Sequence, residues 1–215
     1  MPNTPRLASS KIPRGEARRQ ELIVEAARIL LRDGLDGTSM DLIASEAGAS
    51  KATLYRHFGD RHGLVVAVVQ YLCSDFLADI VHAPPPDTDL RAALHGILSQ
   101  LIHVLSKPTH PDFFRLIVTG SRRAPEIGAT WHEHGPLVWH AMMRAAFADA
   151  RARGELPTGF DAADYPEMLF DAVFADMIIR TAVLGEQVDT PKPPGRYLEM
   201  LLDMVSSRID AHTAP

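Results

Sequence analysis

The stretch that decides the fold runs from Ser39 to Phe58 and reads SMDLIASEAGASKATLYRHF. It predicts two short helices, over residues 40–47 and 51–57, which are capped by Ser39 and Ser50. Gly48 suits the turn between them because glycine adopts positive φ at little cost. Small or apolar residues form their inner faces: Ile43, Ala44, Ala47, Leu54 and Phe58. This pattern predicts a helix-turn-helix, a motif that places its second helix in the major groove of DNA.

Helical periodicity continues on both sides of this motif. Upstream, residues 15–33 carry apolar side chains at helical spacing, and Gly34 is the predicted end of that helix. Downstream, the same period predicts further helices that are mostly separated by prolines: 60–82, 88–106, 111–120, 129–153, 161–185 and 194–212. The first of these halts at the triplet Pro84–Pro86, and no convincing run of alternating β-branched residues occurs. The predicted fold class is all-α, with about nine helices and an N-terminal three-helix DNA-binding domain.

Composition limits the alternatives. The chain has 215 residues, 46% of them apolar and 23% charged, which is ordinary for a folded globular protein. A single cysteine, Cys73, excludes an internal disulfide framework. The first 20 residues lack the apolar core of a secretory signal, and no apolar run has the length of a membrane span. These features lead us to expect a soluble, cytoplasmic protein without a membrane partner.

Charge is unevenly distributed along the chain. Residues 1–62 hold ten basic and eight acidic side chains, whereas residues 63–215 hold 12 and 19. This asymmetry permits a basic functional surface on an acidic body. The excess in the first part is small enough to arise by chance, so charge alone does not decide between a DNA-binding protein and another function.

Over about residues 14–76 the chain resembles the TetR family of bacterial transcriptional regulators. The residues that carry the resemblance are Gly37-Thr38-Ser39, Ile43-Ala44, Ala47-Gly48, Ser50-Lys51 and Thr53-Leu54-Tyr55-Arg56-His57-Phe58. The resemblance implies a flexible arm over residues 1–13, a DNA-binding domain over 14–60 within a TetR-type region of about 16–76, and a ligand-binding and dimerisation domain over 61–215. Leu42 departs from the family pattern, and His62-Gly63 replaces its usual helix-favouring pair, which predicts a looser start for the next helix.

The resemblance also implies a set of DNA-contacting residues: Thr38, Ser39, Ser50, Lys51, Ala52, Thr53, Tyr55, Arg56 and His57. Lys51 and Thr53 would reach bases or phosphates, and the Tyr55 hydroxyl would bond a phosphate. His57 is equally well explained as a packing and capping residue. Arg14, Arg18 and Arg19 fit a solvated charged face at least as well as a contact with the DNA backbone.

The C-terminal part is similar to the AcrR- and AefR-like ligand-binding domains of the same family. The likeness rests on LIVTGSRRAPEI at residues 116–127, on Trp131 and on Gly135-Pro136-Leu137. It implies a helical bundle with a small-molecule cavity. Aromatic and methionine side chains suit an adaptable pocket for a largely apolar effector, although any one of them is more simply core. The candidate pocket residues are Phe114, Arg115, Trp131, His134, Trp139, Met142, Met143, Phe147, Phe170, Phe174 and Met177.

The last two predicted helices favour a homodimer. The helix over 161–185 is apolar on several sides, and such a helix must be buried on more than one side. The final helix carries one apolar stripe, beside which lie Met200 and Met204. The stripe gives the predicted dimer interface: Tyr197, Leu198, Leu201, Leu202, Val205 and Ile209. An ordinary monomer core is the alternative explanation.

The sequence shows no catalytic constellation. It lacks a glycine-rich phosphate loop and a G-x-S-x-G motif, and His132-Glu133-His134 does not place two ligands on one helical face. We therefore expect no enzyme activity, cofactor or metal. The first hypothesis is a repressor that binds double-stranded operator DNA as a homodimer and leaves it when a small effector binds. An all-helical enzyme or small-molecule carrier is the alternative, and the sequence does not separate activator from repressor.

Overall fold

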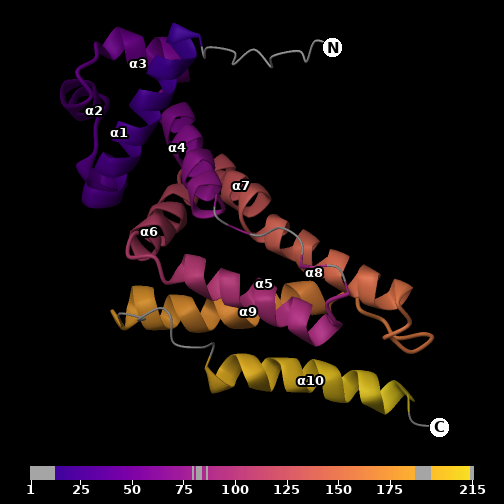
Figure 1. Ribbon diagram of the computed structural model, residues 1–215. Coiled ribbons are helices and arrows are strands. Elements are labelled where there is room, and N and C mark those ends of the chain that lie inside the picture. Colours follow the sequence, from indigo (N-terminus) through magenta and orange to yellow (C-terminus); the bar gives the residue numbers. More distant parts are fainter. Residues whose placement is uncertain (1–12, 79, 81–83, 86, 187–194, 214–215) are drawn as a thin grey trace, which may run out of the picture. The chain divides into compact units, whose positions relative to one another are not determined.

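A computed structural model gives the structure of the chain and describes residues 13–78, 80, 84–85, 87–186 and 195–213 (Figure 1). Every regular element in these ranges is a helix. Their bounds are α1 (Arg14–Gly37), α2 (Met40–Glu46), α3 (Lys51–Phe58), α4 (Arg61–Phe76), α5 (Leu90–Leu105), α6 (His110–Ser121), α7 (Pro125–His134), α8 (Pro136–Ala152), α9 (Tyr165–Ile178), the π-helical turn η1 (Ile179–Val183) and α10 (Arg196–Thr213). The all-α prediction is confirmed. Apart from Pro13, the predicted arm over 1–13 lies outside the described residues, as does Pro86.

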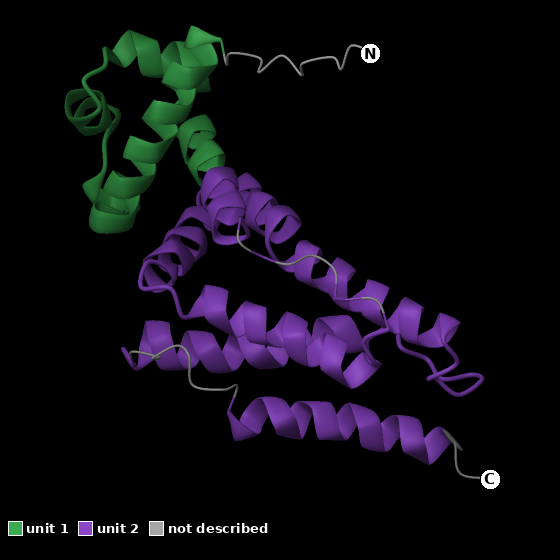
Figure 2. Cartoon of the chain, viewed as in Figure 1, with its two compact units in different colours: residues 1–68 green, residues 69–215 purple. Residues whose placement is uncertain are grey.

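The chain divides into two compact units, residues 1–68 and residues 69–215 (Figure 2). In the first unit, α1 buries one apolar face that includes Leu22, Ile29 and Leu30. Gly34 has φ 70° and ψ 179°, so the regular helix is interrupted at the predicted position before the chain turns into α2. Arg61, at the start of α4, donates to the Leu35 and Thr38 carbonyls and fixes this turn.

The second unit, which we call the body, is built around α5. This helix packs against α8, α9 and α10, and α6 packs against α7. In Figure 1, α5 and α9 run side by side and α10 lies along α5. No helix of the described residues is both long and apolar enough to cross a membrane.

Three predicted helices differ from the observed ones. The helix predicted over 161–185 begins at Tyr165 and becomes a π-helical turn at Ile179. The helix predicted over 129–153 is two helices, because Gly135 leaves helical geometry at φ −120° and ψ −90° and Pro136 starts α8. Proline is tolerated in the first turn of a helix, where its missing N–H needs no partner. The helix predicted over 60–82 ends at Phe76. Of the residues beyond it, 79 and 81–83 lie outside the described ranges.

Candidate functional site

Helices α2 and α3 form the predicted helix-turn-helix. The Ser39 hydroxyl accepts a hydrogen bond from Leu42 N at 3.1 Å, and the Ser50 hydroxyl accepts one from Thr53 N at 3.1 Å, so both predicted caps are confirmed. Gly48 lies between the helices at φ 56°. Of the predicted inner-face residues, Ile43, Ala44, Leu54 and Phe58 are buried, whereas Ala47 is half-buried. The burial of one face of each helix leaves the opposite face of α3 open.

The open face of α3 carries four of the predicted DNA-contacting residues. The exposed residues are Lys51, Ala52, Tyr55 and Arg56. The exposed fraction of Tyr55 is 45%. Their spacing of three and four residues places them along one side of the helix. A cation, a small side chain, a phenol and a guanidinium therefore face outward together, and this combination can contact both phosphates and base edges.

The other predicted DNA-contacting residues have local partners. Thr38 is only 4% exposed and its hydroxyl donates to the Gly34 carbonyl at 2.7 Å, so this side chain faces the interior. The Ser50 and Thr53 hydroxyls lie 2.8 Å apart. His57 is half-buried beside the Phe58 ring, at 6.0 Å between centroids. Ser39 is exposed but holds the N-terminus of α2.

Lys51 forms an ion pair with Asp41 of α2, with 2.7 Å between Nζ and Oδ1. The hydrogen bond to this carboxylate raises the pKa of Lys51 above its ordinary value. Both side chains are exposed, so the pair is open to exchange with solution ions.

Arg18 has a role that the sequence did not reveal. Its Nη2 donates to the Ala47 carbonyl at 3.0 Å and to the Gly48 carbonyl at 3.1 Å. These carbonyls lie at the end of α2 and in the turn, where helix geometry leaves acceptors without partners. Arg18 therefore links α1 to the turn of the motif, which neither sequence interpretation had considered. Arg19 instead lies over the Phe58 ring, 5.4 Å from its centroid.

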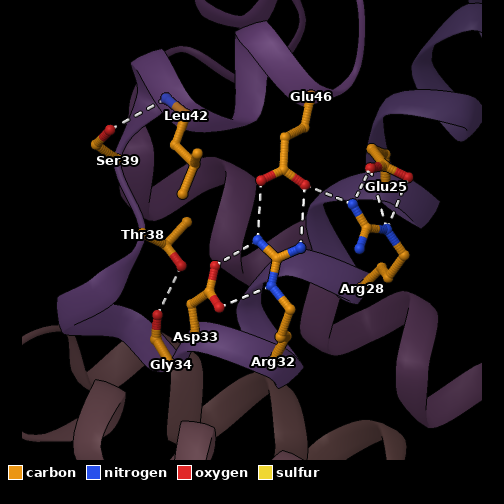
Figure 3. Close-up of polar contacts among 9 residues, drawn as sticks. All are labelled: Glu25, Arg28, Arg32, Asp33, Gly34, Thr38, Ser39, Leu42 and Glu46. Atoms are coloured by element: carbon orange, nitrogen blue, oxygen red, sulfur yellow. Dashed lines mark hydrogen bonds and ion pairs between the residues drawn. The ribbon is translucent and has the colours of Figure 1, made fainter.

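A network of five charged side chains joins α1 to α2 on the surface (Figure 3). Glu46 of α2 accepts hydrogen bonds from Arg28 at 2.5 Å and from Arg32 at 2.9 Å. Arg28 also pairs with Glu25, and Arg32 also pairs with Asp33. The hydrogen bonds from Arg32 and Arg28 hold the pKa of Glu46 below its ordinary value. Two basic residues of α1, Arg28 and Arg32, are therefore already paired with carboxylates of the protein.

Gly63 explains one departure from the family pattern. A Cβ atom at this position would lie 2.1 Å from the Phe58 carbonyl oxygen, closer than any real contact. The Gly63 N–H donates to the Asp60 side chain at 2.8 Å. Glycine therefore permits a close approach of backbone to backbone at the start of α4, where the sequence alone had suggested a loose helix end.

The body contains a small, partly open aromatic cavity of about 30 Å³. Its walls come from the end of α4 and from α5, α6, α8 and α9. Three predicted pocket residues line it: Trp139, Phe170 and Phe174. The sequence did not single out Phe76, Phe113 or His110, which also line it. Both phenylalanines have a residue type of the predicted set: an aromatic pattern extended to α4 would have included Phe76, and Phe113 directly precedes the predicted Phe114 in α6.

The remaining predicted pocket residues do not line this cavity. Phe114 and Trp131 form an aromatic cluster with Phe174, with centroid separations of 5.4–6.4 Å. His134 Nε2 lies 3.2 Å from Nε2 of Gln70 in α4. The exposed Arg115 forms an ion pair with Asp112. The last four are buried in the core of the body: Met142, Met143, Phe147 and Met177.

Most of the predicted dimer stripe on α10 is buried within the chain itself. Leu198, Leu201, Leu202 and Val205 are at most 8% exposed, and α10 packs against α5. Ile209 is half-buried, and Tyr197 is 43% exposed. The buried members of the stripe thus pack in the core of their own body, as the alternative of an ordinary monomer core predicts, and the dimer interface stays a prediction. The exposed apolar residues nearby are different: Ile179, Val183, Leu184, Met200 and Met204.

The geometry of α2 and α3 places the chain in the class of helix-turn-helix proteins. Two family models match it. One is described as bacterial regulatory proteins of the tetR family and matches residues 22–68, and the other is described as a tetracyclin repressor-like C-terminal domain and matches residues 84–190. The chain belongs to the TetR family of bacterial regulatory proteins.

Individual relatives agree with this assignment. The DNA-binding transcriptional repressor TetR of Mycobacteroides abscessus is 34% identical over 104 residues, which make up 48% of this chain and 54% of the relative. The HTH-type transcriptional activator FasR of Mycolicibacterium smegmatis is 33% identical over 98 residues, 44% of each chain. The chain spans about half the length of these curated relatives. A TetR-family protein of known structure from Mesorhizobium loti is 25% identical, with a TM-score of 0.66 over 94% of this chain and 97% of that protein.

Proposed function

We propose that this chain is a ligand-responsive repressor of transcription that binds a palindromic DNA operator as a homodimer. The observation that carries the proposal is the outward face of α3, where Lys51, Tyr55 and Arg56 are exposed beside a capped helix N-terminus. Basic side chains neutralise phosphates, and an arginine can read guanine in the major groove. Membership of the TetR family supports the same function.

The homodimer is supported by the exposed apolar residues of η1 and α10. Val183 is 71% exposed, Leu184 64% and Met204 61%, although all three are apolar. Burial of these side chains against a second copy would remove them from water. A two-fold dimer presents two copies of α3, and its operator is correspondingly palindromic. This interface replaces the buried stripe of α10.

The effector is proposed to bind in the body cavity. Cys73, Phe76 and Leu77, at the end of α4 and just beyond it, form part of the wall. A molecule larger than the present 30 Å³ must displace some of these side chains. Because α4 begins at Arg61, directly after α3, it is the element through which occupancy of the cavity would alter DNA affinity. A coupling free energy of about 1–3 kcal/mol would change that affinity ~5- to 150-fold.

The test of DNA binding uses the full-length chain and DNA from upstream of its own gene. A footprint should reveal a palindromic site, and titrations at several salt concentrations should give the slope of log K against log salt. Lys51→Ala should reduce the steepness of this slope by about one, as expected for one lost phosphate contact. Lys107→Ala, in the body, is the matched control and should leave the slope unchanged. A folded Lys51→Ala variant with the original slope and affinity contradicts the assignment of Lys51.

The sign of regulation needs a separate measurement, because the curated relatives include a repressor and an activator. A promoter that carries the footprinted site is joined to a reporter gene. Repression predicts more reporter product when the chain is absent than when it is present. Less product in its absence shows an activator and overturns this part of the proposal.

A further inference from the structure

The body cavity contains one buried polar group that the proposed DNA-binding function does not use. His110 begins α6, is 4% exposed and lines the cavity. Its Nδ1 has no hydrogen-bond partner among the described protein groups. Buried polar atoms almost always have a hydrogen-bond partner in the protein, because burial removes their bonds to water and an unreplaced bond costs free energy. An unpartnered polar atom on a residue that lines a cavity offers a bound molecule a hydrogen-bonding group once the side chain turns toward it.

The surroundings of His110 are aromatic. Its ring centroid lies 5.4 Å from that of Phe76 and 5.9 Å from that of Phe113, and those two phenylalanines are 5.2 Å apart. Phe170 and Phe174, on another wall, are stacked at 5.3 Å. Flat rings in the lining suit a flat apolar molecule. Such a ligand would need only one polar group, at the position of Nδ1.

The cavity favours an uncharged ligand. Burial lowers the pKa of His110 to about 4 and raises that of the Cys73 thiol to about 12, so both side chains are neutral at physiological pH. Among the lining residues that the structure describes, none is Asp, Glu, Lys or Arg. Lys107, which is not among the lining residues, places its Nζ over the Phe76 ring at 5.6 Å from the centroid. An anion in the cavity would lose its hydration without a lining charge to replace it.

The tautomer of a neutral imidazole determines whether Nδ1 donates or accepts a hydrogen bond. A hydroxyl group can do either, so it suits both tautomers. We propose that the cavity binds an uncharged aromatic molecule that carries a hydroxyl group, and that His110 Nδ1 is hydrogen-bonded to this hydroxyl. Only the role of this molecule as an effector rests on the proposed function. The hydrogen bond itself can be tested without DNA.

The test compares three probes of nearly equal shape with the full-length protein. Para-cresol carries a hydroxyl, para-xylene replaces it by a methyl group, and para-toluate carries a carboxylate. Affinities are measured by calorimetry at neutral pH. We expect para-cresol to bind about tenfold more tightly than para-xylene, which corresponds to about 1.4 kcal/mol, and para-toluate to bind most weakly.

Variants of His110 locate the hydrogen bond. His110→Phe keeps a flat ring but has no Nδ1, and we expect it to bind para-cresol and para-xylene with equal affinity. His110→Asn places an amide near the position of Nδ1 and should restore the preference, which a loss of packing alone would not do. Circular dichroism confirms that each variant is folded. If His110→Phe does not fold, the restored preference in His110→Asn and the order of the three probes on the unmutated chain decide the question.

Three results overturn the inference. Para-cresol that does not bind, or binds no better than para-xylene, shows that Nδ1 does not select a hydroxyl and that water satisfies it instead. A preference that survives in His110→Phe assigns the hydroxyl to another residue. A preference for para-toluate shows that the cavity selects anions. Failure of the proposed function looks different: the preference for para-cresol is present, but the probe does not release operator DNA or the chain binds no operator.

Discussion

In the N-terminal unit, the half-buried Arg18 and the buried Thr38 bond to backbone carbonyls at the turns, whereas the body leaves several buried polar atoms without a hydrogen-bond partner. Arg18 bonds the turn between α2 and α3, and Thr38 bonds the Gly34 carbonyl. Among the described residues, the buried side-chain atoms without a hydrogen-bond partner belong to His110, His140 and Glu167, all in the body. Each such atom costs about 1–3 kcal/mol. Among the described residues, the unpartnered buried side-chain atoms thus lie in the body and none lies in the N-terminal unit.

The largest expected effect is a difference in protein stability between substitutions at two neighbouring residues of α10. Val205 is 3% exposed and Met204 is 61% exposed. Val205→Glu places an unpaired charge in the core of the body and should lower the free energy of unfolding by about 3–5 kcal/mol. Met204→Glu should keep the fold but prevent dimerisation. Chemical denaturation and sedimentation measure the two outcomes, and a Val205→Glu variant as stable as the unmutated chain would refute the burial of this stripe.

The second effect concerns the response of the body to acid. The pKa of His110 falls from 6.5 to about 4 on folding because burial disfavours the charged imidazole. Between these values the unfolded chain binds a proton that the folded chain does not, so stability falls as pH falls from 6.5 to 4. Full loss of this contribution amounts to about 3 kcal/mol. The free energy of unfolding, measured at several pH values across this range, should fall more steeply with decreasing pH for the unmutated chain than for His110→Phe. Equal pH dependence would show that His110 protonates freely.

The third effect tests the rigidity of the N-terminal unit. Arg18→Met keeps much of the aliphatic side chain but removes both hydrogen bonds to the turn, and it should lower the free energy of unfolding by about 1–2 kcal/mol. Operator affinity should fall as well, since the position of α3 depends on the turn. The exposed Arg14 provides the control, and Arg14→Met should change stability little. Equal effects of the two variants would mean that the Arg18 contacts with Ala47 and Gly48 contribute nothing.

The smallest effect belongs to the surface network of Figure 3. Glu46→Gln removes the carboxylate shared by Arg28 and Arg32. Exposed ion pairs contribute little and are screened by salt, so the melting temperature should fall slightly at low ionic strength and remain unchanged at high ionic strength. Glu21→Gln removes a single exposed pair with Arg18 and serves as the comparison. A decrease that persists at high salt would indicate a packing role instead.

The sequence predicted the N-terminal unit better than the body for a physical reason. Caps at Ser39 and Ser50 and a positive φ at Gly48 depend on residues close together in the chain, and local patterns reveal them. The contact of Arg18 with the turn spans 29 residues and depends on a long side chain, so no local pattern signals it.

In the body, periodicity showed which face of α10 is apolar but could not show whether α5 or a second chain covers that face. Apolar spacing also continued through Gly135-Pro136 and concealed the boundary between α7 and α8. Of the cavity residues, His110 was missed because a single histidine gives no pattern, and its importance depends on its burial.

The close approach at Gly63 has an evolutionary consequence. Any mutation of this codon that adds a side chain must push apart the backbone that joins α3 to α4, since a Cβ atom would lie 2.1 Å from the Phe58 carbonyl oxygen. The neighbouring His62 is exposed and can change without such a conflict. Drift in this gene is therefore restricted at one position and free at the next, so lineages that descend from it should keep glycine there while His62 varies.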